Sequence, residues 1–356
     1  MNLRHASLPH VHRLVVKVGS GVVGSGVAPL IAQIAQIRQD GLEVILVSSG
    51  AIAAGMGVLG LKQRPKSLAQ LQACAAIGQG KLMAAYDGLF RKHNLHVAQV
   101  LLTHDDLQSR QRHLNARNTL LQLLADGVIP IINENDTVAV EEIKFGDNDR
   151  LSALVATLVD ADLLIILSHV EGLYRNVGRV TSRGGTAPAA VSGPTKPEVI
   201  STVPAITPEI EALAGGTDRQ TSVGGMKSKI ESAKIVTRAG IPLVIADGER
   251  AAVLPGILAA EDIGTIFLPK GARLESRKRW IAFFQHPTGK LFVDDGAKQA
   301  LIVAGKSLLA KGVASREGET VTGNVVSICD MTGTEFARGL TRDGAVLVHR
   351  DDLVIL

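Results

Sequence analysis

Two clusters of carboxylates and carboxamides are the part of the chain best suited to chemistry. Asn133-Glu-Asn-Asp136 directly follows an apolar run, 128–132, and Gly146-Asp-Asn-Asp149 comes shortly after it. Such side chains compete with the backbone for hydrogen bonds and favour turns, so folding alone gives little reason for their density. Either cluster alone could be an ordinary solvated loop. Both together, at the carboxyl end of a predicted strand, favour a polar small-molecule site.

Lys17 suggests where an anion would bind. It lies inside an apolar run, 14–18, just before Gly19-Ser-Gly-Val-Val-Gly24. A buried lysine is costly unless an anion neutralises it, and glycine N–H groups beside a positive charge suit a phosphate. An edge-strand lysine that reaches solvent is the alternative. The glycine spacing also fits a dinucleotide fingerprint, but the next strand ends in Ser48-Ser49-Gly50 rather than in the required acid, which disfavours a dehydrogenase.

A second glycine segment, Gly224-Gly-Met-Lys-Ser-Lys229, opens a predicted helix that runs to Arg238. Helix N-termini favour anions, whereas two lysines in the first turn oppose the helix dipole. A bound polyphosphate explains these lysines; a solvated, charged helix start is the alternative. Because the P-loop pattern is missing, two lysines from separate loops suggest a nucleoside triphosphate site of another type.

Asp149 is the candidate for an acid that holds Lys17 and Lys229 apart and orients them. Phosphoryl transfer depends on positioning and charge neutralisation more than on covalent chemistry, so such a trio would suffice. The alternative is an N-cap for a helix from Leu151 onward, and one residue could serve both roles.

The elements that must position these residues alternate between strand and helix. The chain has 356 residues, of which 46% are hydrophobic but only 3% aromatic, which suits aliphatic parallel strands buried between helices. The pattern predicts a three-layer α/β/α fold with a mainly parallel sheet. The expected strands are 14–18, 43–47, 96–102, 128–132, 163–167 and 243–246, and the expected helices include 29–40, 67–93 and 226–238.

The composition changes after Pro269. We expect a loose leader at 1–12, a main domain at 13–270 with a surface excursion at 184–208, a linker at 271–279, and a small, mostly β domain at 280–356. Within the small domain the expected strands are 280–284, 290–293, 321–328 and 345–348, with one helix at about 297–305.

Composition also excludes several classes of protein. The most apolar region, 151–167, is interrupted by Asp160 and Asp162, so no membrane span is expected, and the first dozen residues lack the apolar core of a signal peptide. Cys74 and Cys329 have no metal-like spacing, which favours a reduced, cytoplasmic protein. The net charge of +4 does not indicate nucleic acid.

The ordered set of motifs resembles the amino acid kinase family, and among its members the glutamate 5-kinases. The matching segments are Lys17-Val-Gly-Ser20, Ser49-Gly-Ala-Ile-Ala-Ala-Gly55, Asn133–Asp136, Gly146–Asp149, Gly172-Leu-Tyr174 and Gly224-Gly-Met226 with Lys229. Arg277-Lys-Arg-Trp-Ile281 and the following β segment resemble the junction and PUA domain that many of these enzymes carry. The resemblance covers the chain from about Leu14 to its end.

The resemblance implies transfer of the γ-phosphoryl group of ATP to the side-chain carboxylate of L-glutamate, giving L-glutamyl 5-phosphate, in the first step of proline biosynthesis. It also implies inhibition by proline, a dimer or tetramer, glutamyl phosphate reductase as a downstream partner, and Mg²⁺ carried by the ATP phosphates without protein ligands. The acceptor is already ionised, so no general base is needed. Another member of the family, an acetylglutamate kinase or an aspartokinase, is the alternative.

The resemblance also assigns roles. The implied catalytic residues are Lys17, Lys229 and Asp149, and an acid at Asp136 fits the α-ammonium group of the substrate. The implied glutamate-binding residues are Ser49, Gly50, Asn133, Asn135, Asp136, Asp147 and Asn148. The implied nucleotide-binding residues are Lys17, Gly19, Ser168, His169, Val223, Gly224, Gly225, Met226, Lys227, Ser228 and Lys229.

Three departures from the family pattern accompany this match. His169 stands where an aspartate is usual, and Val223 stands where a threonine is usual. A helical stretch common in the family is missing between Arg342 and Asp343. An RNA-binding accessory protein is a further alternative, but residues 271–356 hold 12 lysines and arginines against 10 aspartates and glutamates, which is hardly a basic face.

Overall fold

The structure is a computed structural model that describes residues 3–8, 11–139, 148–175, 198–214, 225–269, 271 and 273–356. The chain divides into two compact units. The N-terminal unit comprises 1–103, 117–237 and 241–270, and the C-terminal unit comprises 104–116, 238–240 and 271–356. Residues 104–116 and 238–240, which we expected in the main domain, therefore belong to the C-terminal unit.

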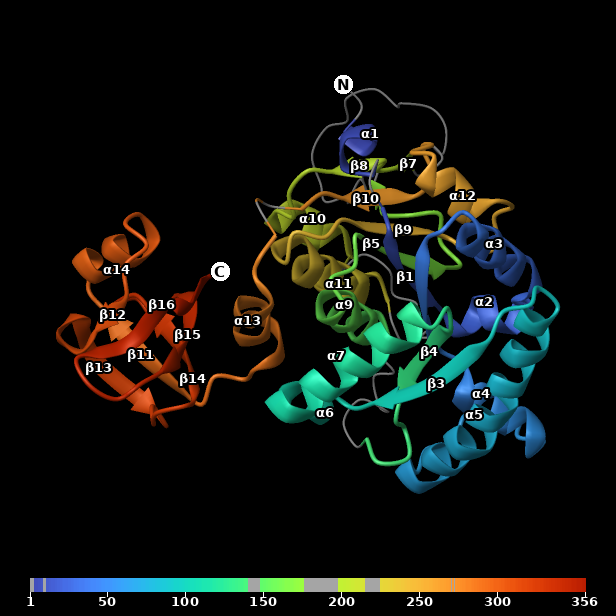
Figure 1. The fold of residues 1–356 in the computed structure, drawn as a ribbon, viewed down its shortest axis with the longest axis horizontal. Helices are drawn as coiled ribbons and strands as arrows, with labels where there is room; N and C mark the ends of the chain where they lie inside the picture. Colours follow the sequence, from blue (N-terminus) through green and yellow to red (C-terminus); the bar gives the residue numbers. More distant parts are fainter. Residues whose placement is uncertain are drawn as a thin grey trace, which may run out of the picture. The chain divides into compact units, whose positions relative to one another are not determined.

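An eight-stranded sheet in the order β3-β4-β2-β1-β5-β9-β10-β8 forms the centre of the N-terminal unit (Figure 1). From β3 to β9 neighbouring strands pair in parallel, whereas β10 runs antiparallel to β9. Since β1 lies between β2 and β5, the strand order reverses there, and ligands bind at such a switch point, outside the carboxyl ends of the strands. The strands are β1 (Arg13–Val18), β2 (Glu43–Ser48), β3 (Val97–Leu102), β4 (Ile129–Glu134), β5 (Leu163–Ser168), β8 (Thr202–Val203), β9 (Leu243–Asp247) and β10 (Thr265–Phe267).

Helices cover both faces of this sheet. Leu14, Val16 and Val18 of β1 join a core with α3 and α12, while the alternate residue Lys17 points toward Asp149 of α9. The helices α9 and α11 lie on the other side of the sheet from α3 (Figure 1). The confirmed arrangement is thus a mainly parallel α/β sheet between helices. The helices are α1 (Leu3–Ser7), α2 (Ser20–Ser25), α3 (Ala28–Gln39), α4 (Ala51–Val58), α5 (Leu68–Arg91), α7 (Arg110–Ala125), α9 (Asn148–Leu158), α10 (Pro208–Leu213), α11 (Met226–Arg238) and α12 (Val253–Leu258).

Helices α4 and α5 pack unusually closely. A Cβ atom at Gly55 would lie 1.8 Å from the carbonyl oxygen of Cys74, and one at Gly78 would lie 1.8 Å from that of Ala51. Only glycine fits at either position. Because α4 starts directly after Ser49-Gly50, this contact positions the segment that follows β2.

Two expectations for this unit need correction. Residues 19–24 were expected as an open glycine loop, but Ser20–Ser25 form the short helix α2. The first N–H groups of a helix have no partner within the helix, so α2 can offer donors to an anion as a glycine loop would. Residues 3–8 are not a loose leader: Leu3–Ser7 form α1, and Leu8 is buried in the core. The sequence of residues 3–8 suggested a solvated segment because it is polar and because the residues that it contacts are distant along the chain.

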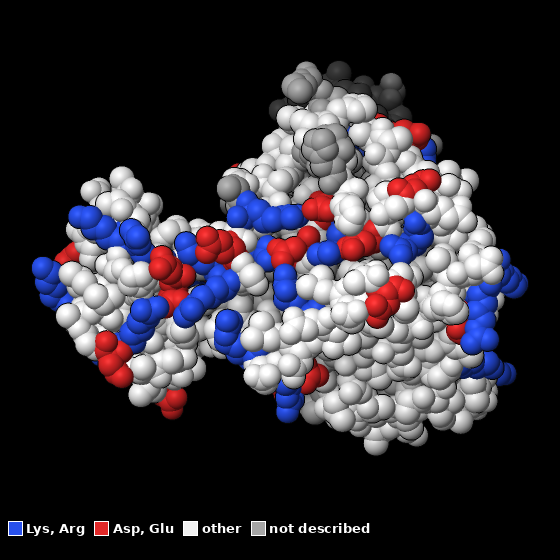
Figure 2. All heavy atoms as spheres, in the orientation of Figure 1, with Lys and Arg blue, Asp and Glu red and all other residues white. Residues whose placement is uncertain are grey.

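The C-terminal unit contains a six-stranded sheet in the order β12-β16-β15-β14-β11-β13. Its core is aliphatic, built from residues such as Leu291, Val326 and Ile328. On the face of the C-terminal unit shown in Figure 2, cationic and anionic side chains intermingle. The elements are α6 (His104–Gln108), α13 (Ser276–Arg279), β11 (Gly289–Val293), α14 (Asp295–Ile302), β12 (Leu308–Leu309), β13 (Val313–Gly318), β14 (Val325–Cys329), β15 (Glu335–Thr341) and β16 (Val346–Ile355).

Residues 280–284 were expected as a strand, and this was wrong. Trp280–Phe284 form a π-helical turn, η2, which continues α13. A short apolar run cannot distinguish a buried strand from a buried helical turn. Here Phe284 meets the His113 ring edge-on, with centroids 4.6 Å apart, and Trp280 lies under the guanidinium of Arg110, 5.0 Å away.

Candidate active site at the carboxyl ends of the central strands

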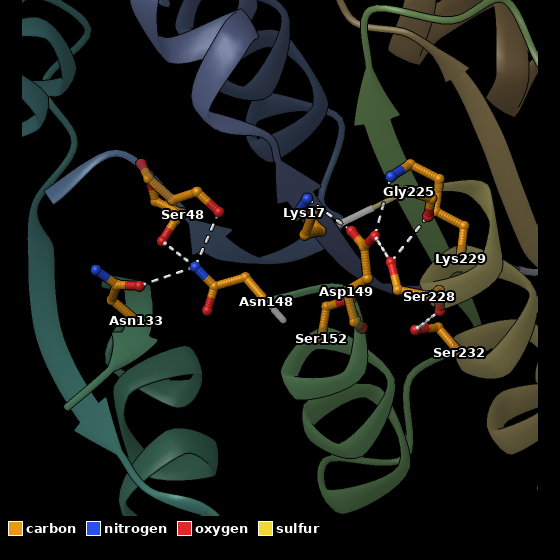
Figure 3. A network of polar contacts seen from close by, with 11 residues as sticks. Lys17, Ser48, Asn133, Asn148, Asp149, Ser152, Gly225, Ser228, Lys229 and Ser232 are labelled. Atoms are coloured by element: carbon orange, nitrogen blue, oxygen red, sulfur yellow. Dashed lines mark hydrogen bonds and ion pairs between the residues drawn. The ribbon is translucent and has the colours of Figure 1, made fainter. Parts of the chain in front are cut away.

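Lys17 and Lys229 meet at the carboxylate of Asp149 (Figure 3). Lys17 Nζ lies 2.6 Å from Oδ1, and Lys229 Nζ lies 3.0 Å from Oδ2. All three side chains are buried. Two cations around one anion leave an excess positive charge out of water, which a further anion would neutralise. The arrangement therefore suits a phosphate placed beside both ammonium groups.

Asp149 is ionised in this site. Burial alone would raise the pKa of its carboxyl group, but Lys17 and Lys229 outweigh burial and lower the pKa to about 2. Ser228 also donates to Oδ2, at 2.7 Å. Because the folded-state pKa is depressed, the stabilisation exists at neutral pH and is lost as the pH falls through about 2. Asp149 lies inside the first turn of α9, so its carboxylate serves the lysines and is not the N-cap of a helix from Leu151.

A second polar cluster surrounds the amide of the neighbouring residue, Asn148. Its Nδ2 lies within hydrogen-bond distance of the backbone oxygen of Ser48 (3.1 Å), Oγ of Ser49 (2.9 Å) and Oδ1 of Asn133 (3.0 Å). Asn133 in turn donates to Oε1 of Gln79 at 2.9 Å. These contacts connect the ends of β2 and β4 with the start of α9. The adjacent residues Asn148 and Asp149 thus belong one to each cluster (Figure 3).

A cavity of about 350 Å³ opens at the end of β4, and we call it the Asp136 cavity. Asn135 and Asp136 line it, as do Gln79 and Gln99. Burial raises the pKa of Asp136 to about 6, and Arg64 opposes this rise. A carboxylate that is partly out of water gains from a nearby cation, so Asp136 is suited to bind an ammonium group.

A second cavity, the Asp247 cavity, has a volume of about 360 Å³ and lies where β5 and β9 end. Its lining holds three carboxylates against one guanidinium, and this site was not predicted from the sequence. The lining residues are Glu171, Val199, Ser201, Asp247, Arg250, Asp262, Ile263 and Gly264. Asp247 at the end of an expected strand, and Glu171 beside the Gly172-Leu-Tyr174 motif, were the signals available in the sequence.

The remaining predicted residues fall into four groups. Gly19 lies beside Lys17, since a Cβ atom there would be 3.7 Å from Lys17 Nζ, and Gly50 precedes α4 with φ of +109°. Ser168 ends β5, and a Cβ atom at Gly21 would lie 3.9 Å from Nδ1 of His169. At the start of α11, Gly225 accepts from Ser228, whereas Lys227 is exposed and makes no ion pair with a described residue. Asp147, Val223 and Gly224 lie outside the described residues.

Within the described ranges, no group of three or more histidine, cysteine, aspartate or glutamate side chains is arranged to hold a metal ion. In the same ranges, no helix is both long enough and apolar enough to cross a membrane. Cys74 and Cys329 are buried free thiols.

Comparison with known proteins identifies the family of the chain. The amino acid kinase family matches residues 12–247, and the PUA domain matches 289–344. Glutamate 5-kinase of Syntrophotalea carbinolica is 44% identical over 99% of this chain and 100% of its own length. That of Moorella thermoacetica is 44% identical over 98% of each chain. The crystal structure of UMP kinase from Bacillus anthracis is 12% identical over 73% of this chain and 97% of its own, with a TM-score of 0.45.

The family match covers well over half of the chain and includes β1, β5 and α11, which carry or flank the two lysines. The relatives match it from end to end at more than 40% identity. The chain therefore belongs to the amino acid kinase family, and within it to the glutamate 5-kinases with a C-terminal PUA domain.

Proposed function

We propose that the chain transfers the γ-phosphoryl group of ATP to the side-chain carboxylate of L-glutamate, giving L-glutamyl 5-phosphate and ADP. The observation that carries the proposal is the adjacency of Asn148 and Asp149, which joins an amide-lined acceptor site to a pair of lysines. The names of the full-length relatives support glutamate as the acceptor and disfavour acetylglutamate kinase and aspartokinase.

Lys17 and Lys229 would stabilise the charge of the migrating phosphoryl group. One ammonium group about 4 Å from a phosphate oxygen gives roughly 4 kcal/mol of Coulomb attraction at an intermediate dielectric, before desolvation is subtracted. Both lysines are already buried and held by Asp149, so little reorganisation is needed when the transition state forms. Only the part of the attraction that is stronger in the transition state accelerates the reaction.

The acceptor would lie with its α-ammonium group at Asp136 and its side-chain carboxylate near Ser49 and Asn148. The Oγ of Ser49 and the amide of Asn148 are 2.9 Å apart, so they can orient one carboxylate together. Because a glutamate carboxylate is ionised at neutral pH, it attacks the phosphorus atom directly, and no residue has to accept a proton. The bond from phosphorus to the ADP oxygen breaks as the new bond forms.

We infer that the Asp247 cavity takes the nucleoside. From β1, which carries Lys17, the sheet continues to β5 and then to β9, two steps of about 4.8 Å each. The phosphate chain of ATP can cover such a distance from the lysines to the ends of β5 and β9. Carboxylates such as Glu171 and Asp247 accept hydrogen bonds from ribose hydroxyls and repel phosphates, which favours this orientation of the nucleotide.

Magnesium would be held by the phosphate oxygens and would add positive charge there. The residues present fit this assignment, because both oxygens of Asp149 already face lysines. The buried free cysteines support a reduced, cytoplasmic setting.

Regulation and assembly follow from the same proposal. Proline, an amino acid with the same α-carboxylate and a cationic nitrogen, would compete with glutamate in the Asp136 cavity, and kinetics insensitive to proline would refute this.

The strand β3 lies at an edge of the sheet and bears no charged side chain, and such edges are normally covered, which supports a homo-oligomer. Because an acyl phosphate hydrolyses readily, a downstream glutamyl phosphate reductase is the expected partner.

An ADP-release assay with glutamate, acetylglutamate, aspartate or no acceptor tests the proposal. We expect release only with glutamate at comparable concentrations, and trapping of the product by hydroxylamine as the hydroxamate. Release that is equally fast without an acceptor, or faster with acetylglutamate or aspartate, would contradict the assigned acceptor. Failure of hydroxylamine to trap a product would contradict the acyl phosphate.

A further inference from the structure

Arg4 is buried at the N-terminal end of the chain, with 1% of its side chain exposed. Its Nη1 donates to the carbonyl oxygens of Glu261 (3.0 Å) and Ile263 (2.8 Å). Its Nη2 donates to those of Ser201 (2.6 Å) and Gly264 (2.5 Å). Nη2 also lies 3.2 Å from the carboxylate of Asp262, which is largely exposed. One guanidinium thus connects two segments that are far apart in the sequence.

The same two segments form a wall of the Asp247 cavity. Among the residues that Arg4 contacts, Ser201, Asp262, Ile263 and Gly264 all line this cavity. Ser201 lies directly before β8, and Gly264 lies directly before β10. Both strands are short, and β8 stands at the edge of the sheet, so their own ladder holds the wall only weakly.

Further contacts connect this wall with the opposite side of the cavity. Thr265, next to Gly264, accepts a hydrogen bond from the backbone N–H of Leu173 at 2.8 Å. A Cβ atom at Gly264 would lie 2.1 Å from the carbonyl oxygen of Ile245, which leaves the turn no room to move toward β9. The segment around Glu171 and the turn at Gly264 are therefore coupled.

We propose that Arg4 is a positioning residue for nucleotide binding: it holds the wall formed by residues 201 and 261–264 in the conformation that receives the nucleoside. The inference rests on the proposed function, because it takes the Asp247 cavity as the nucleoside site. Without the guanidinium, carbonyl groups of both segments lose their donor, and buried acceptors left without a partner are costly. The wall then relaxes, and the nucleoside meets a cavity of altered shape.

Arg4→Met tests the proposal in the full-length chain. The variant keeps a long side chain to fill the space but donates no hydrogen bond. We expect the KM for ATP to rise by roughly tenfold or more, as for a misplaced positioning group, with the KM for glutamate within twofold of wild type and kcat within threefold. Calorimetric titration with ADP alone should show the same loss of affinity.

Arg13→Met is the matched control. Arg13 also donates to a carboxylate, Glu43 at 2.6 Å, and to a backbone carbonyl, Val159, but it lies at the amino-terminal end of β1, away from the cavity. It should lower the melting temperature and leave the KM for ATP unchanged. An equal rise of this KM in both variants would show a general effect of destabilisation and overturn the proposal.

Two further results separate the possible failures. An unchanged KM for ATP in Arg4→Met overturns the role of Arg4, whereas a wild-type enzyme that does not phosphorylate glutamate overturns the proposed function. If Arg4→Met does not accumulate as folded protein, Arg4→Lys tests the role of Arg4 instead. Lysine keeps the positive charge, but its ammonium group lacks the planar fork of donors with which the guanidinium binds both segments. The KM of this variant for ATP should rise by at least about threefold without a matching change in the KM for glutamate, and an unchanged value would overturn the role of Arg4.

Discussion

Lys17 of β1 and Lys229 of α11 bind opposite oxygens of a single carboxylate, that of Asp149. Each ammonium group is therefore fixed by a partner that the other lysine shares. Removing one lysine leaves a single ammonium group at the carboxylate of Asp149, and the excess of positive over negative charge within this trio disappears.

Lys17→Ala and Lys229→Ala should each reduce kcat by at least roughly a hundredfold, the scale of losing one preorganised group that stabilises charge. Steady-state ADP release measures this. Lys234→Ala is the control, since Lys234 lies on the same helix but pairs with Glu211 and Glu231. Turnover near the wild-type value in either active-site variant would overturn the role of that lysine.

Glutamate binding should depend on pH through Asp136, whose pKa is raised by burial to about 6. Only the ionised carboxylate attracts the substrate ammonium group, so the KM for glutamate should fall by about tenfold between pH 5 and pH 7. In the absence of glutamate, the free energy of unfolding changes with pH in the opposite direction: a rising pH improves glutamate binding but lowers stability. A raised pKa means that the folded chain binds the proton more tightly, so stability falls as the pH rises from about 4 to above 6.

Asp136→Asn is the matched variant for this pH profile. It should raise the KM for glutamate at pH 7 and remove its dependence on pH in this range. Its melting temperature at pH 7 should exceed that of the wild type, because the buried charge is gone. A variant that keeps the wild-type pH profile would show that another group titrates.

Gly78→Ala should force α4 and α5 apart, since the new Cβ would lie 1.8 Å from the carbonyl oxygen of Ala51. We expect a loss of about 1–3 kcal/mol in the free energy of unfolding and a higher KM for glutamate, because Ala51 follows Ser49-Gly50. Gly88→Ala on the same helix meets no atom within 4 Å and should stabilise by up to about 1 kcal/mol. Denaturant unfolding of both variants gives the comparison, and similar losses would contradict it.

Truncation should distinguish two parts of the C-terminal unit. A chain that ends at residue 276 lacks Phe284 and Trp280, which contact His113 and Arg110. A chain that ends at residue 287 keeps both. We expect the shorter chain to lose several degrees of melting temperature relative to the longer one, because loss of a buried phenylalanine costs about 3–5 kcal/mol. Equal melting temperatures would show that these contacts contribute little.

The strands that carry the site were predictable because they are long aliphatic runs, and their alternation with helices indicated a mainly parallel sheet. The order of the strands in that sheet was not predicted. Lys17 and Asp149 were predictable for a different reason, namely that such groups gain nothing from burial unless they meet a partner. The family resemblance also assigned Asn148 to glutamate binding and Asp149 to catalysis. Their adjacency was visible in the sequence. That Asn148 contacts the ends of β2 and β4, through Ser48 and Asn133, became visible only in the folded chain.

The Asp247 cavity and Arg4 were not predictable in the same way. β8 has two residues and β10 has three, too few for any period to appear in the sequence. Arg4 lies in a polar segment that resembles a solvated end, and its acceptors are backbone carbonyls, which have no signature in the sequence. Contacts that depend on main-chain atoms from distant segments become visible only in the folded chain.

The sheet order has a consequence for how new specificities can arise. Ser49 and Asn133 lie at the ends of β2 and β4, on one side of β1, whereas Ser168 and Asp247 lie at the ends of β5 and β9, on its other side. Under the proposed function, recognition of the acceptor and recognition of the nucleotide are thus encoded largely in different stretches of the chain. Substitutions on the first side can exchange one phosphate acceptor for another while the apparatus that delivers the phosphate is inherited unchanged.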